Sequence, residues 1–424
     1  MATARIVARS WDKAQVLTAL FLASAWVAVA LELARASRRL DAWIVGDWLI
    51  NYAGGFVRRG LPGEAIRLLW KATGVAPPAW VLGLQLVLYA VFFLSAFRLL
   101  RSRLTDWGFL LATLSPAVFS FWVLDHQGAG RKEILYFAVL ATYGVMLKRD
   151  SGLLRSDLRH GLLLSAGLTV LVLSHEMLFL FSPFLLTLLL VSRQEGAREM
   201  PRFALRALVA PALAVAFSVG FPGNASVAAR ICRSLRRYAP DECQGASAIG
   251  YLARNAGNAM GDVAKEIRDH GLVSTYVIAL LLGAVPFCLI LLSWKPWERL
   301  PALLRSRLDV QVFLVALAAP LPAFAVGYDW GRFLNMYFVS VLIVFCAWTD
   351  RRARMGQATA AAVGAVMKDP PAPRRWDRGV AALLALAYVT CWSMPHSGGP
   401  VGSGFLPTVG RGLARIAAAV AGRE

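Results

Sequence analysis

Four short groups of charged residues interrupt an otherwise apolar sequence, and their residue types suit phosphate binding and the activation of a hydroxyl group. The first group lies in residues 46–72, GDWLINYAGGFVRRGLPGEAIRLLWKA, which carry Asp47, Arg58, Arg59 and Glu64 among several glycines. A guanidinium group presents a planar set of donors that matches phosphate oxygens, and glycine lets the backbone approach a ligand closely. The alternative is that both arginines pair with Glu64 and Asp47 to hold a re-entrant loop.

The second group is residues 125–133, DHQGAGRKE, where His126, Arg131, Lys132 and Glu133 surround a glycine turn. A new apolar run begins directly after the turn, so the free N–H groups of a helix start would add to the two cations. These residues predict a second phosphate-binding element. An exposed polar loop is the alternative interpretation.

The third group is the pair His175–Glu176, which lies between the apolar stretches LTVLVLS and MLFLF. Ionisable residues this deep in apolar sequence are costly and mark functional sites by default. Glu176 is therefore a candidate general base, with His175 orienting it or sharing the proton. A buried ion pair with a distant arginine is the alternative. The HExxH spacing of zinc sites is absent, so no metal site is predicted.

The fourth group, YDWGRF, places Asp329 and Arg332 between two apolar runs. The two side chains either form a local pair at a helix end or bring a carboxylate and a cation into a shared site. The neighbouring Tyr328 and Trp330 suit the apolar face of a sugar ring. The aromatic belt at a membrane interface explains them equally well.

Composition places these groups in a membrane protein. The 424-residue chain is 58% hydrophobic and has a mean hydropathy of +0.57, whereas soluble domains are nearer 45–50% apolar. The formal net charge of +20 is spread over short basic clusters between apolar runs, as in cytoplasmic loops. With no nucleic-acid motif present, we predict an all-α polytopic membrane protein that does not bind nucleic acid.

The apolar runs predict about 11 transmembrane helices within one integral membrane domain, residues 1–424. The runs are 15–33, 79–97, 108–124, 134–147, 161–174, 177–191, 204–221, 272–294, 310–327, 333–348 and 379–394. Flanking Lys and Arg residues put the N-terminus in the cytoplasm and the C-terminus in the periplasm. All four charged groups then face the periplasm. One long tilted helix over 161–191 is the alternative that would reverse the topology downstream.

The segments between these runs have distinct expected roles. Residues 34–78 form the first periplasmic loop, 222–271 a large periplasmic loop, 349–378 a cytoplasmic linker and 395–424 a periplasmic tail, which ends in a short surface helix. The large loop contains two stretches with the apolar spacing of amphipathic helices. It also holds Cys232 and Cys243, which would form a disulfide if the loop lies in an oxidising compartment.

With about eleven spans, a charged first outer loop and outer arginines, most of the chain resembles the bacterial GT-C-like glycosyltransferases and the O-antigen or exopolysaccharide polymerases. The resemblance implies that a carboxylate of the first outer loop is catalytic, here Asp47 or, second, Asp41. It also implies that outer arginines bind the substrate, for which Arg58, Arg59, Arg131 and Arg332 are available.

We therefore predict glycosyl transfer from a polyprenyl-(pyro)phosphate donor on the periplasmic face of the bacterial inner membrane. Asp47, His175 and Glu176 are the catalytic candidates, and the donor would be bound by Arg58, Arg59, Glu64, His126, Arg131, Lys132, Glu133, Asp329 and Arg332. The expected partners are membrane lipid, the polyprenyl-linked glycan and other proteins of envelope-polysaccharide assembly. No cofactor is predicted, although a divalent cation is left open.

Two other functions remain open at this point. A transporter or flippase of an anionic lipid or solute would use His175–Glu176 as a proton relay. An outer-face acyl or phosphoryl transferase would use His175 as its base.

Overall fold

The computed structural model describes residues 12–149, 157–192, 200–240, 243–294, 308–363, 375–397 and 401–404. This part of the chain is helical except for one antiparallel pair of two-residue strands. The first half contains α1 (Lys13–Arg39), η1 (Gly46–Leu49), η2 (Tyr52–Gly54), α2 (Leu61–Thr73), α3 (Pro77–Leu100), α4 (Trp107–Leu114), α5 (Phe121–Leu124), α6 (Glu133–Arg149), α7 (Asp157–Ser174), η4 (Glu176–Phe181) and α8 (Ser182–Ser192).

The second half begins with the bent pair α9 (Met200–Gly220) and α10 (Ala225–Leu235). It continues with η6 (Arg236–Tyr238), η7 (Gly250–Ala253), α11 (Ala256–His270), α12 (Leu272–Trp294), α14 (Leu308–Ala318), α15 (Ala323–Val326), α16 (Trp330–Val363), α17 (Arg375–Thr390), β1 (Trp392–Ser393) and β2 (Gly402–Ser403).

The helices support a multi-pass membrane protein. Within the described residues, five candidate spans are long and apolar enough to cross a bilayer: α1, α3, α12, residues 308–326 and the first part of α16. A sixth is obtained if α9 and α10, which meet at 102°, are counted as one broken span. The other predicted runs lie on shorter helices, among them α7 and the η4–α8 segment.

The structure corrects the expected start of the cytoplasmic linker and decides between the two alternatives for residues 161–191. Residues 349–363, expected to begin a cytoplasmic linker, instead continue α16, because the alanine-rich sequence there favours helix and contains no proline. Residues 161–191 do not form one long helix. The chain leaves helical geometry at His175, where φ is −164° and ψ is 111°, and a 3₁₀ segment follows.

Helices α3, α5 and α6 meet around an aromatic core. Phe92 on α3 lies 5.3–5.5 Å, between ring centroids, from Trp122 and Phe137, and all three side chains are buried. Such offset and edge-to-face pairs add to the hydrophobic free energy of burial. This core fixes the ends of α5 and α6, and the second charged group lies in the turn between them.

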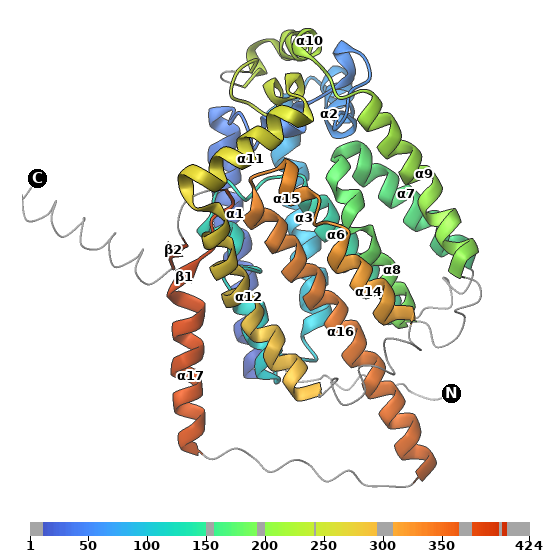
Figure 1. The fold of residues 1–424 in the computed structure, drawn as a ribbon, viewed down its shortest axis with the longest axis vertical. Helices are drawn as coiled ribbons and strands as arrows, with labels where there is room; N and C mark the ends of the chain where they lie inside the picture. The colour runs from blue at the N-terminus through green and yellow to red at the C-terminus, as the bar shows by residue number, and fades with distance from the viewer. Residues whose placement is uncertain are drawn as a thin grey trace, which may run out of the picture.

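The two predicted outer loops pack together at one end of the helices, where α2, α10 and α11 gather (Figure 1). The Arg58 amide donates to the carbonyl of Phe221, and the Ala248 amide donates to that of Ala42. The loop 222–271 contains two amphipathic helices, as predicted, at α10 and α11. Because backbone hydrogen bonds join the loops, the first loop has a fixed position over the helix ends.

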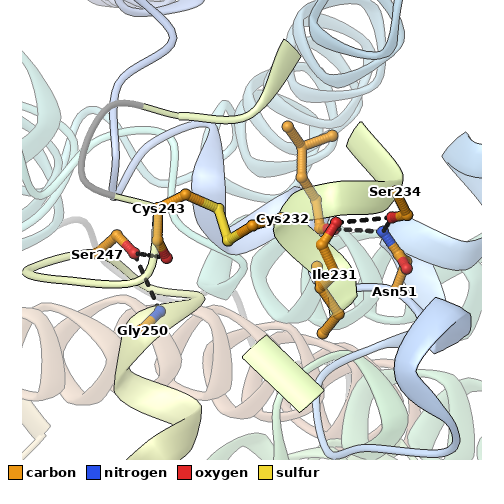
Figure 2. The surroundings of a disulfide bond; sticks show 8 residues. Asn51, Ile231, Cys232, Ser234, Cys243, Ser247 and Gly250 are labelled. Atoms are coloured by element: carbon orange, nitrogen blue, oxygen red, sulfur yellow. Dashed lines mark hydrogen bonds between the residues drawn. A yellow bond between two sulfur atoms is a disulfide. The ribbon is translucent and has the colours of Figure 1, made fainter. Parts of the chain in front are cut away.

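A disulfide between Cys232 and Cys243 ties α10 to the segment that follows it (Figure 2). Near it, the Asn51 side chain donates to Ser234 Oγ, and the Ser234 hydroxyl donates to the carbonyl of Ile231 (Figure 2). The bridge therefore stabilises the platform against which the first loop packs. Disulfides form and persist in oxidising compartments.

Replacing Cys232 and Cys243 together by serine is expected to lower the free energy of unfolding by about 3 kcal/mol, as the closure of a loop of this length predicts. The bridged residues are 11 apart in sequence. The measurement is thermal unfolding in detergent, with and without dithiothreitol. Reductant should destabilise the wild-type protein by a similar amount and leave the double variant unchanged. Equal sensitivity of both proteins to reductant would contradict the role given to this bridge.

Candidate functional site

Ten ionisable side chains from four separate segments meet at the end of the molecule covered by the outer loops. We call them the charged cluster: Asp47, Arg58, Arg59, Arg131, Lys132, Glu133, His175, Glu176, Asp329 and Arg332. They comprise four arginines, one lysine, four carboxylates and one histidine. The structure thus brings all four charged groups of the sequence into one network.

The turn that carries Arg131 and Lys132 is anchored through the glycine before them. The carbonyl of Gly130 accepts hydrogen bonds from Trp48 Nε1 at 2.6 Å and from Gln85 Nε2 at 2.7 Å, and its amide donates to Tyr89 Oη. Gly130 has a φ of +72°, and a Cβ there would lie 2.5 Å from a side-chain carbon of Ile44. Only glycine fits this position, which fixes the start of α6 and its two cations.

Asp47 and Lys132 form a buried ion pair at the centre of the cluster. Lys132 Nζ lies 3.5 Å from Asp47 Oδ1 and donates to the carbonyl of Arg59 at 2.8 Å. Burial alone would raise the pKa of Asp47, but the charges of Lys132 and Arg131 outweigh it and hold the pKa well below its usual range. Burial lowers the pKa of Lys132 to about 8, against the opposing charge of Asp47.

Glu176 is bound by both arginines of the first loop. Its carboxylate accepts two hydrogen bonds from Arg59 Nε, at 3.0 and 3.1 Å, and one from Arg59 Nη2 at 2.7 Å, while Arg58 Nη1 approaches to 3.3 Å. Arg59 has a φ of +65°, which is unfavourable for a residue with a Cβ. The ion pair with Glu176 and the hydrogen bond from Lys132 hold Arg59 in this conformation.

Arg332, near the start of α16, joins two further carboxylates. Its Nη1 donates to Glu133 Oε1 at 2.6 Å, and its Nη2 pairs with Asp329 Oδ2. Burial would raise the pKa of Asp329, but the charges of Arg332 and Arg131 overcome this and lower the pKa. Within the YDWGRF group, Arg332 therefore forms the local pair with Asp329 and also contacts Glu133 on α6.

Arg131 is the exception among the arginines. Its guanidinium carbon lies 5.4 Å from the centre of the Trp43 ring, a cation–π contact. Among the described residues, no carboxylate comes within ion-pair distance of Arg131, and its buried Nε atom has no hydrogen-bond partner. One cation of the cluster is therefore available for an anion.

Several other buried polar atoms of the cluster also have no hydrogen-bond partner in the described part of the protein. They are Asp47 Oδ1, Glu133 Oε2, His175 Nδ1 and Arg332 Nε, which together with Arg131 Nε make five of the ten such atoms found. Buried polar groups are nearly always paired in folded proteins, and exceptions concentrate where a ligand or water binds. This concentration marks the cluster as a candidate binding site.

Two residues predicted to bind substrate lie outside the cluster. Glu64 pairs with Arg67 one turn along α2 and accepts the amide of Tyr52, because the helix places these groups within reach of each other. His126 is exposed, and no hydrogen bond or ion pair joins its ring to the cluster among the described residues. The alternative pairing of Arg58 and Arg59 with Glu64 and Asp47 is also wrong, since both arginines bind Glu176.

Asp41, the second catalytic candidate, has a structural contact instead. Its Oδ1 accepts the amides of Trp43 at 2.9 Å and Ile44 at 2.6 Å. Such contacts stabilise a turn after the end of α1. Asp41 therefore shapes the entry into the first loop.

His396, which follows β1, makes a contact that was not predicted from the sequence. Its Nδ1 donates to Asp125 Oδ1 at 2.8 Å, and its amide donates to Asp125 Oδ2 at 2.6 Å. The His396 carbonyl accepts the amide of Gly331, where a Cβ would overlap the carbonyl of Pro395. The available signal was a histidine in the polar stretch SMPHSGG, directly after the last apolar run.

Among the described residues, no group of three or more His, Cys, Asp or Glu side chains is placed to hold a metal ion. The charged cluster provides fixed cations, one buried aspartate and a buried imidazole. Such a site can bind an anion and accept a proton.

Comparison with known proteins gives one match. A protein-family model described as uncharacterised membrane protein Rv1490 matches residues 15–250, more than half of the chain. No curated protein and no solved structure matches. The matched range includes Asp47, Arg59, Lys132 and Glu176 but ends before Arg332. The chain therefore belongs to the Rv1490 family of membrane proteins.

Proposed function

We propose that this protein transfers a sugar or glycan from a polyprenyl-(pyro)phosphate donor on the periplasmic face of the bacterial inner membrane. In this proposal the chain crosses the membrane eleven times, with several passes made by short or broken helices. The charged cluster then lies at the outer end of the bundle. The disulfide in the packed outer loops supports this orientation, because disulfides persist in the periplasm and not in the cytoplasm.

The observation that carries the proposal is Arg131. It stacks on Trp43, lacks a carboxylate partner among the described residues and lies within electrostatic range of Asp47. A phosphate bound there would gain charge-assisted hydrogen bonds from a guanidinium that is already positioned. The same cation would stabilise the negative charge that develops on the leaving group.

Asp47 is the proposed base for the acceptor hydroxyl. The hydroxyl oxygen forms a bond to the anomeric carbon, the bond from that carbon to the phosphate oxygen breaks, and the phosphate leaves with the electron pair. The hydroxyl proton moves to the Asp47 carboxylate, whose Oδ1 is buried and has no hydrogen-bond partner among the described residues. Lys132 would keep Asp47 ionised before the reaction.

Glu176 is the weaker candidate for the base, because its carboxylate oxygens already accept hydrogen bonds from two arginines. A lone pair engaged in this way is not free to take a proton. We assign to Glu176 the role of positioning Arg58 and Arg59. The same contacts count against a His175–Glu176 proton relay in a transporter.

The test uses the protein reconstituted into vesicles with a polyprenyl-phosphate sugar and a hydroxyl acceptor. Arg131→Gln is expected to raise the KM for the donor at least tenfold, and Arg230→Gln, an exposed arginine on α10, is expected to leave it unchanged. Consumption of the donor that requires Arg131 supports the transferase. Proton flux coupled to movement of an intact anion, with no donor consumed, would replace it by the transporter.

The pKa of Lys132 predicts an alkaline limit to activity. Above pH 8, Lys132 loses its charge and the charged cluster loses one of its cations beside the proposed phosphate site, so the transfer rate should fall between pH 8 and 9. Lys132→Arg, if it supports transfer, should remove this decline because arginine stays charged. The measurement is the pH profile of kcat for both proteins.

Unfolding at high pH does not explain such a decline. The folded-state pKa of about 8 lies below the usual pKa of 10.5 for a free lysine, so the folded protein binds fewer protons on this group. Its contribution to stability is therefore unfavourable below pH 8 and improves as the pH rises toward 10.5. A profile that is flat through pH 9 in the wild-type protein would contradict the assigned role of Lys132.

A further inference from the structure

An apolar cavity of about 440 Å³ lies between α12, the α14–α15 segment and α16. Its walls are almost wholly apolar and rich in aromatic rings, including Tyr276, Phe287, Trp330, Tyr337 and Phe338. The volume falls in the range of small-molecule sites. Nothing in the charged cluster requires a cavity here, so its presence needs a separate explanation.

The cavity opens sideways, toward the surface that would face the bilayer. Val273, Val277 and Leu280 line it on α12 and are 45–48% exposed. Leu321, on the opposite wall, is 59% exposed. Because α12 and α16 both qualify as membrane spans, the opening lies at a depth where the surrounding solvent is hydrocarbon.

The end of the cavity at the start of α16 adjoins the charged cluster. Trp330 lines the cavity at the start of α16, and Arg332, two residues later, points to Glu133 inside the bundle. Tyr276, on the facing wall, donates its hydroxyl hydrogen to the carbonyl of Pro395 and lies within electrostatic range of Asp329 and Arg332. An apolar chain in the cavity would therefore carry a polar head at the level of the cluster.

We propose that this cavity binds the hydrocarbon chain of a single-chain lipid phosphate, whose phosphate group reaches the cations of the charged cluster. The identification of this lipid as the donor of glycosyl transfer rests on the function proposed above. Binding of the lipid itself does not, because it follows from the apolar walls, the lateral opening and the adjacent cations.

One chain fits this site better than the two chains of a bulk phospholipid. The cavity has a volume of about 440 Å³ and is bounded by α12 on one side and α16 on the other. Aromatic side chains on both walls provide rigid contact surfaces for a branched hydrocarbon. The specificity would then come from a phosphate bound at Arg131, which a neutral lipid lacks.

The test is photo-crosslinking in phospholipid vesicles with a polyprenyl phosphate that carries a diazirine in its tail. Ala284 lines the cavity, and Ala284→Trp would fill it. Val285, its neighbour on α12, is 41% exposed and does not line the cavity, so Val285→Trp is the matched control. We expect at least tenfold less labelling for Ala284→Trp and wild-type labelling for Val285→Trp.

Mapping of the labelled peptides in the wild-type protein provides a second measurement that does not depend on the folding of any variant. Labels concentrated on α12 and α16 support the proposal. Labels spread evenly over the lipid-facing helices, unchanged labelling of Ala284→Trp, or equal labelling by a diacyl phospholipid probe would overturn it. Correct labelling without donor consumption would overturn glycosyl transfer and leave the lipid site standing.

Discussion

Replacement of Asp47 by asparagine is expected to lower the rate of glycosyl transfer by about 10²–10⁴-fold, the usual contribution of a positioned general base. Asparagine keeps the size of the side chain but cannot accept the proton of the acceptor hydroxyl. The measurement is kcat in reconstituted vesicles at saturating donor. Because the chemical step is affected, kcat should fall much more than KM rises.

A structural effect of this substitution has to be separated from a catalytic one. Asp262→Asn is the matched control, since Asp262 also forms an ion pair in the outer loops, at 2.7 Å from Arg254, but lies outside the charged cluster. We expect near wild-type kcat for this control. Asp47→Asn with normal activity, or with activity lost only in proportion to unfolded protein, would refute the assignment of Asp47.

Breaking the pair between Arg59 and Glu176 is expected to cost about 2–3 kcal/mol of unfolding free energy, since the remaining partner keeps a charged group in a mostly buried site. The side chains of Arg59 and Glu176 are only 23% and 15% exposed. A double-mutant cycle with Arg59→Met and Glu176→Gln should show that the two effects are far from additive. The measurement is denaturant unfolding in detergent.

The same cycle on Glu32 and Arg35 supplies the control, because that pair lies one helical turn apart on α1 and the Arg35 side chain is 64% exposed. Pairs of this kind contribute about 0.5 kcal/mol or less. Glu176→Gln should also raise the KM for the donor, since Arg58 and Arg59 lose the carboxylate that positions them. Additive effects in the Arg59–Glu176 cycle would show that the ion pair does not hold the first loop.

Hydropathy and basic flanks led to the prediction that four charged segments share one side of a membrane, and residues from all four segments meet in the structure. Asp47, Arg131, Glu176 and Arg332 are separated by long stretches of sequence, yet a shared end of a helix bundle is enough to gather them. The pattern also predicted the two helices of the large loop. The chemical roles of the charged residues are the subject of the function proposed above.

The partner of each charge was beyond the reach of the sequence. Glu64 is near Arg58 and Arg59 in sequence but binds Arg67, whereas Glu176, 117 residues from Arg59, binds both loop arginines. Such choices depend on the positive φ of Arg59 and on the break at His175, and neither leaves a signal in residue type. The Asp125–His396 contact spans 271 residues and was missed for the same reason.

The close approach of Gly331 to Pro395 has a consequence for the order in which the protein is assembled. The segment around His396 is made late in synthesis, after the helices that carry Asp125 and Gly331 have left the ribosome. A chain that ended before residue 392 would leave the Asp125 carboxylate without its contacts to His396 beside the start of α16. This link between the end of α5 and the start of α16 would then form only after translation of the segment that follows α17.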